Sequence, residues 1–388
     1  MQKEQAHLRL KPGKERPLLQ HHHWIYSGAV AELPQDAPFA TVFSHSGKRL
    51  GIAMLNHGRS IVGHLLAFGE ESLEQALADR LSRALALRKQ LFDPSTTNAI
   101  RLVNAEGDGL PGLIIDSYNG VLVLQISHPS LDTLKPFLLE WLITHAQPRA
   151  IYEKSTSFLR KKEGLEEVRA HLYGESIEEV EIIENGLRYS VHLLEGQKTG
   201  LFLDQREMRA LVRQISSGRK VLNCFAYTGG FSLAALAGGA TSVDSVESSK
   251  KCEPWLEKNL ALNGLSNHRF FCEDAIAFIA KEPLPYDLII LDPPAFVKKR
   301  QDIDTAFRAY KDLNCTAIAK MPPNSLLLTC SCSYHVSEEL FQNILFRASL
   351  EAGRRVRILE KHRQAHDHPL SIFHPESSYL KSFLLAVD

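Results

Sequence analysis

Apolar and polar positions follow different patterns in different parts of the chain. In residues 1–70, short strand-like apolar runs lie between turn residues such as Pro12-Gly13 and Ser46-Gly47. This pattern predicts a small β-rich module, with strands at His7–Leu10, Thr41–Ser44, Gly51–Leu55 and Ile61–Leu65. A helix is predicted over Glu70–Phe92, because leucine and alanine recur there at helical spacing until Asp93-Pro94.

Residues 96–172 predict a second α+β segment. A helix is expected at Leu131–His145. Four strands are expected, at Ile100–Asn104, Leu113–Tyr118, Val121–Ile126 and Ala150–Lys154. Asn119-Gly120 is a strong signal for a type I′ turn, which would join two of these strands into a hairpin. Asn185-Gly186 predicts a similar hairpin at the start of the next region.

From Ser176 onward, apolar strands alternate with amphipathic helices. The strands are expected at Val221–Phe225, Ser242–Glu247, Arg269–Cys272, Tyr286–Leu291 and Leu326–Cys330, with late strands at Val356–Leu359 and Phe383–Val387. The helices between them are expected at Gln205–Ile215, Phe231–Ala237, Ser249–Leu262, Asp304–Lys320 and Ser337–Glu351. Such alternation is typical of a doubly wound, Rossmann-like parallel sheet. We therefore predict an α/β fold in three domains, at residues 1–70, 71–175 and 176–388.

The stretch Lys220–Glu247 has the pattern of half a nucleotide-binding βαβ unit. A strand, a turn at Tyr227-Thr228-Gly229-Gly230, a helix and a second strand ending on Glu247 follow one another. Later strands end on Asp274 and Asp292. Ligands of such sheets bind at the carboxyl ends of the strands, so these polar residues predict a binding crevice.

A dinucleotide-dependent dehydrogenase is one alternative for this crevice. Its glycine fingerprint is not met, because the turn lacks a third glycine at the required spacing. Hydride transfer would also leave Asp292-Pro293-Pro294 and the run Thr329–Ser333 unexplained. The sequence therefore disfavours this class.

The composition excludes several classes of protein but does not by itself identify a function. At 44% hydrophobic and 23% charged residues, with a net charge of +0, the chain is of ordinary globular type. No apolar run reaches the roughly 18 residues of a membrane span, and the first residues lack a signal-peptide pattern. All six cysteines lie within Cys224–Cys332, which predicts a reduced, cytoplasmic protein without a disulfide framework. Adjacent side chains of His21-His22-His23 face opposite ways, so no metal site is predicted there.

An ordered set of motifs resembles one known family. The motifs are His23–Gly28, Gly107–Gly112, Gly196–Gly200 with Asp204-Gln205-Arg206, Asn223–Phe231, Asp292–Phe296 and Cys330–Ser333. Together they resemble the large-subunit ribosomal RNA cytosine-C5 methyltransferases with an N-terminal PUA-like domain. The resemblance spans nearly the whole chain. It implies a PUA-like RNA-binding domain, an α+β middle domain and a class I methyltransferase domain.

The family resemblance also implies S-adenosyl-L-methionine as cofactor. It places the methionine part at the turn, the ribose at Glu247, the adenine amino group at Asp274 and the cofactor entrance near Gln205 and Arg206. The turn residues are Phe225, Ala226, Tyr227, Thr228, Gly229, Gly230 and Phe231. Asp292 is expected to contact the target base and to border the cofactor.

Methylation at cytosine C5 requires a nucleophile, because the ring carbon alone is too weak to attack a sulfonium methyl group. A thiolate that adds to C6 makes C5 nucleophilic, and a group at N3, here Asp292, would stabilise the adduct. Cys330 and Cys332 would face the same side of a strand, so spacing does not separate them. The family pattern favours Cys332. Related enzymes use a second cysteine where this chain has Ala295, which leaves the base for the C5 proton unassigned. Cys224, Cys252, Cys272 and Cys315 are expected to be small buried hydrophobic residues.

The partner implied by the resemblance is large-subunit ribosomal RNA. Phe296 could stack on the target base, and Lys298, Lys299 and Arg300 could contact phosphates. Exposed edges of the N-terminal module could support a homodimer. Two other functions are compatible with the motifs: methylation of an exocyclic base nitrogen, which needs no cysteine, and a ribosome-assembly factor that binds RNA without turnover.

Overall fold

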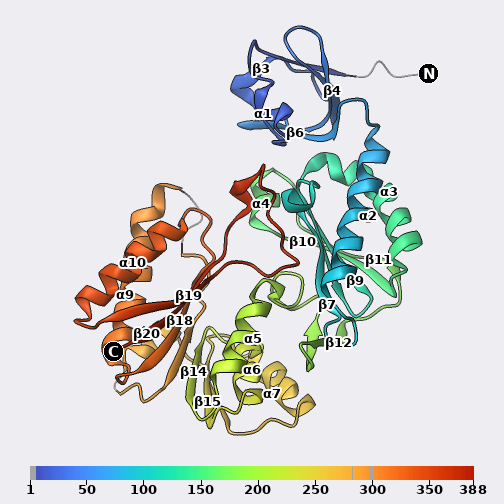
Figure 1. Ribbon diagram of the computed structural model, residues 1–388. Coiled ribbons are helices and arrows are strands. Elements are labelled where there is room, and N and C mark those ends of the chain that lie inside the picture. The colour runs from blue at the N-terminus through green and yellow to red at the C-terminus, as the bar shows by residue number, and fades with distance from the viewer. Residues whose placement is uncertain (1–5, 282, 297–299) are drawn as a thin grey trace. The chain divides into compact units, whose positions relative to one another are not determined.

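The computed structural model describes residues 6–281, 283–296 and 300–388 (Figure 1). The chain forms two compact units. Unit 1 comprises Met1–Ile183, Val191–Leu203 and His366–Ser377, and unit 2 comprises Glu184–Ser190, Asp204–Ala365 and Ser378–Asp388. The boundaries predicted at residues 70 and 175 stay predictions. Among the described residues, no helix is both long and apolar enough to cross a membrane.

Unit 1 begins with a six-stranded sheet in the order β2-β6-β5-β4-β1-β3. The strands are β1 His7–Leu10, β2 Trp24–Tyr26, β3 Val30–Glu32, β4 Phe39–Phe43, β5 Arg49–Leu55 and β6 Ile61–Phe68. The short helix α1 (Arg16–Leu19) and the 3-10 turn η1 (Ser27–Ala29) connect them. Leu8, Val42 and Leu65 are fully buried in its core. The predicted β-rich module is confirmed, while the sequence pattern missed β2, β3 and α1.

Helix α2 (Leu73–Leu91) follows this sheet. Ser72 caps its first turn, because its Oγ accepts from the Gln75 N–H and the Gln75 side chain accepts from the Ser72 N–H. This reciprocal capping box explains why the helix begins at Leu73 rather than at the predicted Glu70. One face of the helix is buried, including the side chain of Arg88.

The remainder of unit 1 is built on a five-stranded sheet in the order β11-β10-β9-β8-β7. Its strands are β7 Ala99–Asn104, β8 Leu113–Tyr118, β9 Val121–Ile126, β10 Ala150–Ser155 and β11 Val168–Gly174. The other elements are α3 Pro129–Ala146, α4 Phe158–Lys162 and the 3-10 turn η2 Ala105–Asp108. Positive φ angles at Asn119 and Gly120 confirm the predicted turn between β8 and β9. A second such turn joins β12 (Glu179–Glu184) to β13 (Leu187–His192).

Unit 2 contains a seven-stranded sheet in the order β16-β15-β14-β17-β18-β20-β19. The strands are β14 Lys220–Cys224, β15 Ser242–Val246, β16 His268–Phe271, β17 Leu288–Leu291, β18 Ser325–Ser331, β19 Val356–His362 and β20 Lys381–Val387. Strands β14 to β18 run parallel to one another. Strand β20 lies between β18 and β19 and runs antiparallel to both. The predicted doubly wound α/β fold is confirmed; the insertion of β20 was not predicted.

Helices cover both faces of this sheet (Figure 1). The helices are α5 Arg206–Ile215, α6 Gly230–Ala237, α7 Cys252–Leu262, α8 Ala275–Ile279, α9 Ile303–Lys320 and α10 Glu338–Glu351. Two 3-10 turns, η3 Leu203–Gln205 and η4 Arg300–Asp302, precede α5 and α9, and a third, η5 Pro375–Ser377, belongs to unit 1. Apolar residues of α8, α9 and α10 share a core with one face of the strands. Burial on both faces explains the nearly uninterrupted apolar runs of β14, β17 and β18.

Two arginines of α5 surround a buried carboxylate. Arg209 donates to both oxygens of Glu184, at 2.6 and 2.7 Å, and Arg206 Nε lies 3.4 Å from Glu184 Oε2. The Glu184 side chain is 1% exposed. These contacts fix the start of α5, and with it Gln205 and Arg206, because each buried charge requires its partner.

We expect Glu184→Ala to lower the free energy of unfolding of unit 2 by about 3–5 kcal/mol, because two guanidinium groups lose a buried counterion. Urea denaturation followed by circular dichroism measures the change. Glu338→Ala is the matched control: it breaks an exposed pair with Lys361 and should cost less than about 1 kcal/mol. Equal effects for both variants would contradict this expectation.

Candidate active site

The order of the strands in unit 2 reverses beside β14. The chain passes from β14 to β15 and β16 on one side, then to β17 and β18 on the other. The connections from β14 and β17 therefore leave in opposite directions at the carboxyl edge, which is where ligands of open α/β sheets bind. Cys224 is in register with Leu291 of β17 and Val246 of β15, so the loops after these three residues meet at this edge.

The turn after β14 has an unusual backbone. Phe225 and Tyr227 have φ angles of 59° and 48°, and Gly229 has φ 81°. Non-glycine residues at positive φ are strained, and such strain gathers at binding sites. A Cβ atom at Gly229 would lie 2.7 Å from Leu256 Cγ, so the turn requires glycine there. The free N–H groups of α6 begin directly after it, at Gly230.

Two carboxylates lie after the neighbouring strands, as predicted. Glu247, at the end of β15, accepts from the N–H groups of Tyr227 at 3.0 Å and Ser249 at 2.9 Å. Its Oε1 also accepts from the Ser248 hydroxyl at 3.3 Å. A carboxylate has about four acceptor positions, so capacity for at least one ribose hydroxyl remains. Asp274, after β16, is exposed and caps α8 by accepting from the Ala277 N–H at 2.8 Å through Oδ1.

Gln205 and Arg206 are both buried at the start of α5, each with 2% exposure. Arg206 faces Glu184, as described above, and its place near the cofactor entrance stays a prediction. Gln205 instead hydrogen-bonds to the thiol of Cys330. Its Oε1 is buried and has no hydrogen-bond partner among the described residues.

The two candidate cysteines have different surroundings. Cys330 lies within β18, is fully buried, and its thiol donates to Ser382 Oγ at 3.3 Å. Burial raises its pKa well above the ordinary value, so its thiolate is disfavoured. Cys332 follows the strand, is half-buried, and its thiol lies 3.7 Å from the Pro293 carbonyl oxygen. The structure thus brings Cys332 to the Asp292-Pro293-Pro294 loop and leaves Cys330 in the core.

The loop after β17 supplies the other predicted residues. Asp292 is half-buried, and its negative charge contributes to the raised pKa of Cys330. The Phe296 ring packs 4.6 Å from the Tyr310 ring, centre to centre, against the core. Lys298 and Lys299 lie outside the described residues, as does the side chain of Arg300, so their RNA contacts stay predictions.

Lys381 is a site residue that the sequence pattern missed. It begins β20 opposite Ser331, is 6% exposed, and donates to the carbonyl oxygens of Ser333 and Tyr379, both at 2.7 Å. Burial lowers its pKa to about 8, and the negative charge of Cys332 opposes this shift. The ammonium therefore fixes the loop on which Cys332 lies. A lysine at the start of a late strand gave no chemical signal in the sequence.

The remaining cysteines agree with expectation except for one. All six are free. Cys224 and Cys252 are buried and Cys315 is partly buried, but Cys272 is exposed. The prediction that Cys272 is buried was wrong, because β16 ends at Phe271 and Cys272 already lies in the following loop.

Two family models match the chain. Residues 8–68 match a PUA-like domain, and residues 107–352 match the S-adenosylmethionine-dependent methyltransferases. A protein of Alteromonas mediterranea named ribosomal RNA large subunit methyltransferase I is 38% identical, over 98% of this chain and 99% of its own length. The chain belongs to this methyltransferase family. A relative of the same name from Cronobacter sakazakii is 37% identical over 96% of this chain and 97% of its own length.

Solved structures of methyltransferases resemble the whole chain. A Streptococcus mutans protein assigned as an S-adenosylmethionine-dependent methyltransferase is 26% identical, covers 98% of this chain and 100% of its own, and superposes with a TM-score of 0.85. A second structure, in complex with S-adenosylhomocysteine, is also 26% identical with the same coverage and a TM-score of 0.86. S-adenosylmethionine is the cofactor of this family, and the glycine turn with the carboxylate of Glu247 fits it.

We expect Glu247→Gln to weaken S-adenosylmethionine binding roughly tenfold or more, the effect of losing one hydrogen bond to a charged group. Isothermal titration calorimetry with S-adenosylmethionine measures the affinity. Glu339→Gln, an exposed carboxylate on α10, is the control and should bind as the wild type does. An unchanged affinity in Glu247→Gln would remove the ribose role of this residue.

Lys381→Met should slow alkylation of Cys332 by iodoacetamide several-fold at pH 7, because a nearby ammonium favours the thiolate. Lys381, with its pKa lowered to about 8, is charged below that pH and neutral above it. The difference between wild type and variant should therefore be greatest below pH 8 and vanish above it. Mass spectrometry of the Cys332 peptide gives the rates. Lys361→Met, an exposed lysine on β19, is the control. A rate ratio that does not change with pH would contradict this role.

Proposed function

We propose that the protein methylates C5 of a cytosine in large-subunit ribosomal RNA, with Cys332 as the nucleophile. The observation that supports this most strongly is the half-buried Cys332 thiol beside the Pro293 carbonyl oxygen. It lies at the same sheet edge as the cofactor turn. The relatives named ribosomal RNA large subunit methyltransferase I support the choice of RNA.

The position of Cys332 suits the chemistry that C5 methylation demands. S-adenosylmethionine supplies an electrophilic methyl group on a sulfonium. The Cys332 thiolate adds to C6 of cytosine, which moves the electron pair of the C5–C6 bond onto C5. C5 then forms the new carbon–carbon bond to the methyl group as the methyl–sulfur bond breaks, and its electron pair stays on sulfur to give S-adenosylhomocysteine. Loss of the C5 proton restores the double bond and expels the thiolate.

Two residues of unit 2 assist these steps in this proposal. Lys381 offsets the negative charge of Cys332 before attack, because its ammonium is hydrogen-bonded to the adjacent Ser333 carbonyl oxygen. Asp292 lies half-buried after β17 and accepts from or donates to the cytosine ring at N3 and the adjacent amine. We assign no residue to removal of the C5 proton.

The setting of this activity is proposed to be the cytoplasm. Six free cysteines suit a reducing compartment. Homodimer formation through the exposed edges of the N-terminal sheet stays a prediction.

The test of the proposed function is the position of the transferred methyl group. Purified protein is incubated with labelled S-adenosylmethionine and large-subunit ribosomal RNA, and the modified nucleoside is identified by mass spectrometry. We expect 5-methylcytidine. A methyl group on an exocyclic nitrogen would support the alternative enzyme, and no transfer under any condition would leave only the assembly-factor alternative.

Cys332→Ala should abolish methyl transfer, whereas Cys330→Ala should keep most of it, because only Cys332 is accessible to a base. RNA that contains 5-fluorocytosine separates a nucleophile from a structural cysteine: fluorine cannot leave as a proton does, so the adduct stays covalent. We expect a denaturant-resistant complex with the wild type and Cys330→Ala but none with Cys332→Ala, read by gel electrophoresis. The reverse pattern would assign the role to Cys330.

A further inference from the structure

A second candidate site lies in unit 1, and none of its wall residues is among those assigned to methyl transfer. A cavity of about 480 Å³ is formed between β6, α2, the loop at residues 106–109 and the segment His366–Ser377. Its walls include His21, Phe68, Arg80, Gly109 and Phe373. Its volume falls in the range of about 300–1,000 Å³ of small-ligand pockets. We propose that it binds one unstacked nucleotide of the RNA substrate, an inference that rests on the proposed function.

Aromatic rings supply the surface on which a base could stack. The His21 ring lies 5.3 Å from the Phe68 ring and 5.3 Å from the Phe373 ring, centre to centre. Phe373 is 48% exposed and the neighbouring Ile372 is 88% exposed, so apolar surface faces solvent at the rim. Exposed rings beside a cavity are the recurrent platform for single-stranded nucleic acid, because every base has a π face.

Arg80 supplies a hydrogen-bond donor inside the cavity. Its guanidinium carbon lies 5.7 Å from the Phe68 ring centre, and Nη2 lies 3.9 Å from Glu71 Oε2. Nη1 is buried and has no acceptor among the described residues. A buried donor without an acceptor is costly, so a ligand oxygen at this point would be bound favourably. A phosphate or a base carbonyl oxygen meets this requirement.

The glycine-rich motif at residues 107–112 explains how Arg80 reaches this position. Gly109 has φ +70°, and a Cβ atom there would lie 3.1 Å from Arg80 Cδ and Nε. A side chain at residue 109 would therefore displace the arginine. The motif is not used by the methyl-transfer site, and forming this wall gives it a role.

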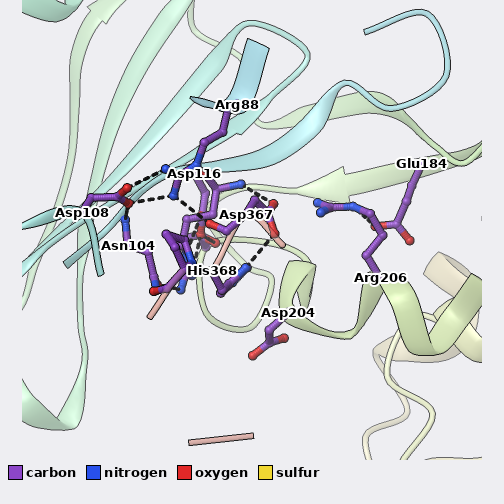
Figure 2. Close-up of polar contacts among 12 residues, drawn as sticks. Arg88, Asn104, Asp108, Asp116, Glu184, Asp204, Arg206, Asp367 and His368 are labelled. Atoms are coloured by element: carbon purple, nitrogen blue, oxygen red, sulfur yellow. Dashed lines mark hydrogen bonds and ion pairs between the residues drawn. The ribbon is translucent and has the colours of Figure 1, made fainter. Parts of the chain in front are cut away.

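Asp108 fixes the same loop from the other side. It accepts from Arg88 through both oxygens, at 2.6 and 2.7 Å, and from the Asn104 N–H at 2.6 Å. Arg88 also donates to the Asp367 carbonyl oxygen at 2.8 Å, which joins the loop to the segment that holds Phe373. Figure 2 shows these side chains around Asp108. The walls of the cavity are thus preformed.

One buried donor carries the polar recognition of the cavity. The charge of Asp108 is balanced by Arg88, which is outside the cavity wall. Burial raises the pKa of Glu106 and so favours its neutral form. Glu71 lies opposite Arg80, and the largely exposed Arg83 pairs with Asp79, so these charges balance. Nη1 of Arg80, without an acceptor among the described residues, is therefore the group that would bind a nucleotide oxygen.

Binding of single-stranded RNA to variants tests the proposal. The probes are a fluorescein-labelled decauridylate and a labelled fragment of large-subunit ribosomal RNA, read by fluorescence anisotropy. Arg80→Met keeps the apolar stem but removes the donor, and Phe373→Ala removes one stacking face. Each should weaken binding roughly tenfold, as expected for loss of one stacked base or its polar contact. Arg80→Lys, which keeps a positive charge, should weaken RNA binding less than Arg80→Met does.

Phe346→Ala is the matched control, because Phe346 is a similarly exposed phenylalanine on α10. It should bind RNA as the wild type does. Melting temperature and S-adenosylmethionine affinity should be unchanged in all variants, which excludes misfolding. RNA that contains 4-thiouridine should crosslink to the peptide with Phe373 in the wild type.

The outcomes separate this proposal from the proposed function. Wild-type RNA affinity in both Arg80→Met and Phe373→Ala, or crosslinks confined to unit 2, would overturn the cavity site even if 5-methylcytidine is formed. If Arg80→Met and Phe373→Ala weaken RNA binding but the wild type forms no 5-methylcytidine, the RNA site in the cavity stands and the proposed methylation at C5 does not. Uridine monophosphate that binds as tightly as decauridylate, with the same dependence on Arg80, would mean a free-nucleotide site and also overturn the proposal.

Discussion

Neighbouring parallel strands end at the same edge of a sheet, and the candidate active site of unit 2 depends on that constraint. Each of the loops after β14, β15, β16, β17 and β18 contributes one candidate group at this edge. The reversal of strand order beside β14 separates two of these loops and makes room for a ligand. The buried strands need only be apolar, while the one or two residues after each strand determine the chemistry. The donor half and the acceptor half of the site therefore come from opposite sides of β14.

A shift of two residues gives the two candidate cysteines different surroundings. Cys330 is still within β18, where β20 covers it and burial raises its thiol pKa. Cys332 lies past the last strand residue, where the sheet no longer covers it. Burial acts in the opposite direction on Lys381 by lowering its pKa. Burial thus favours the neutral form of both the Cys330 thiol and the Lys381 amine, because desolvation disfavours whichever form of a group is charged.

Local sequence signals predicted much of this structure, and distant contacts account for what they missed. Hairpins about Asn119-Gly120 and Asn185-Gly186 were predicted correctly, because the turn chemistry is contained in two residues. The edge strand β11 was missed, since its side chains are mostly exposed and its pattern is polar. The order of the glycine turn and the carboxylates was predictable from the period of the strands. Glu184, Ser333 and Phe373, which meet Arg206, Lys381 and the Arg80 cavity, lie tens to hundreds of residues away from them, so no local pattern could identify these contacts.

The position of β20 has a consequence for the synthesis of the protein. This strand is the last described element of the chain, yet it lies between β18 and β19 inside the sheet. Just before it, His366–Ser377 returns to unit 1 and contacts Arg88 and Asn104. Before β20 is synthesised, β18 lacks a strand partner on one side and β19 lacks its only strand partner. Unit 1 likewise lacks the segment His366–Ser377 until these residues leave the ribosome. Domains usually fold in order as they emerge. Here neither unit can complete its fold before this last part of the chain is synthesised, so the two units depend on the same late residues.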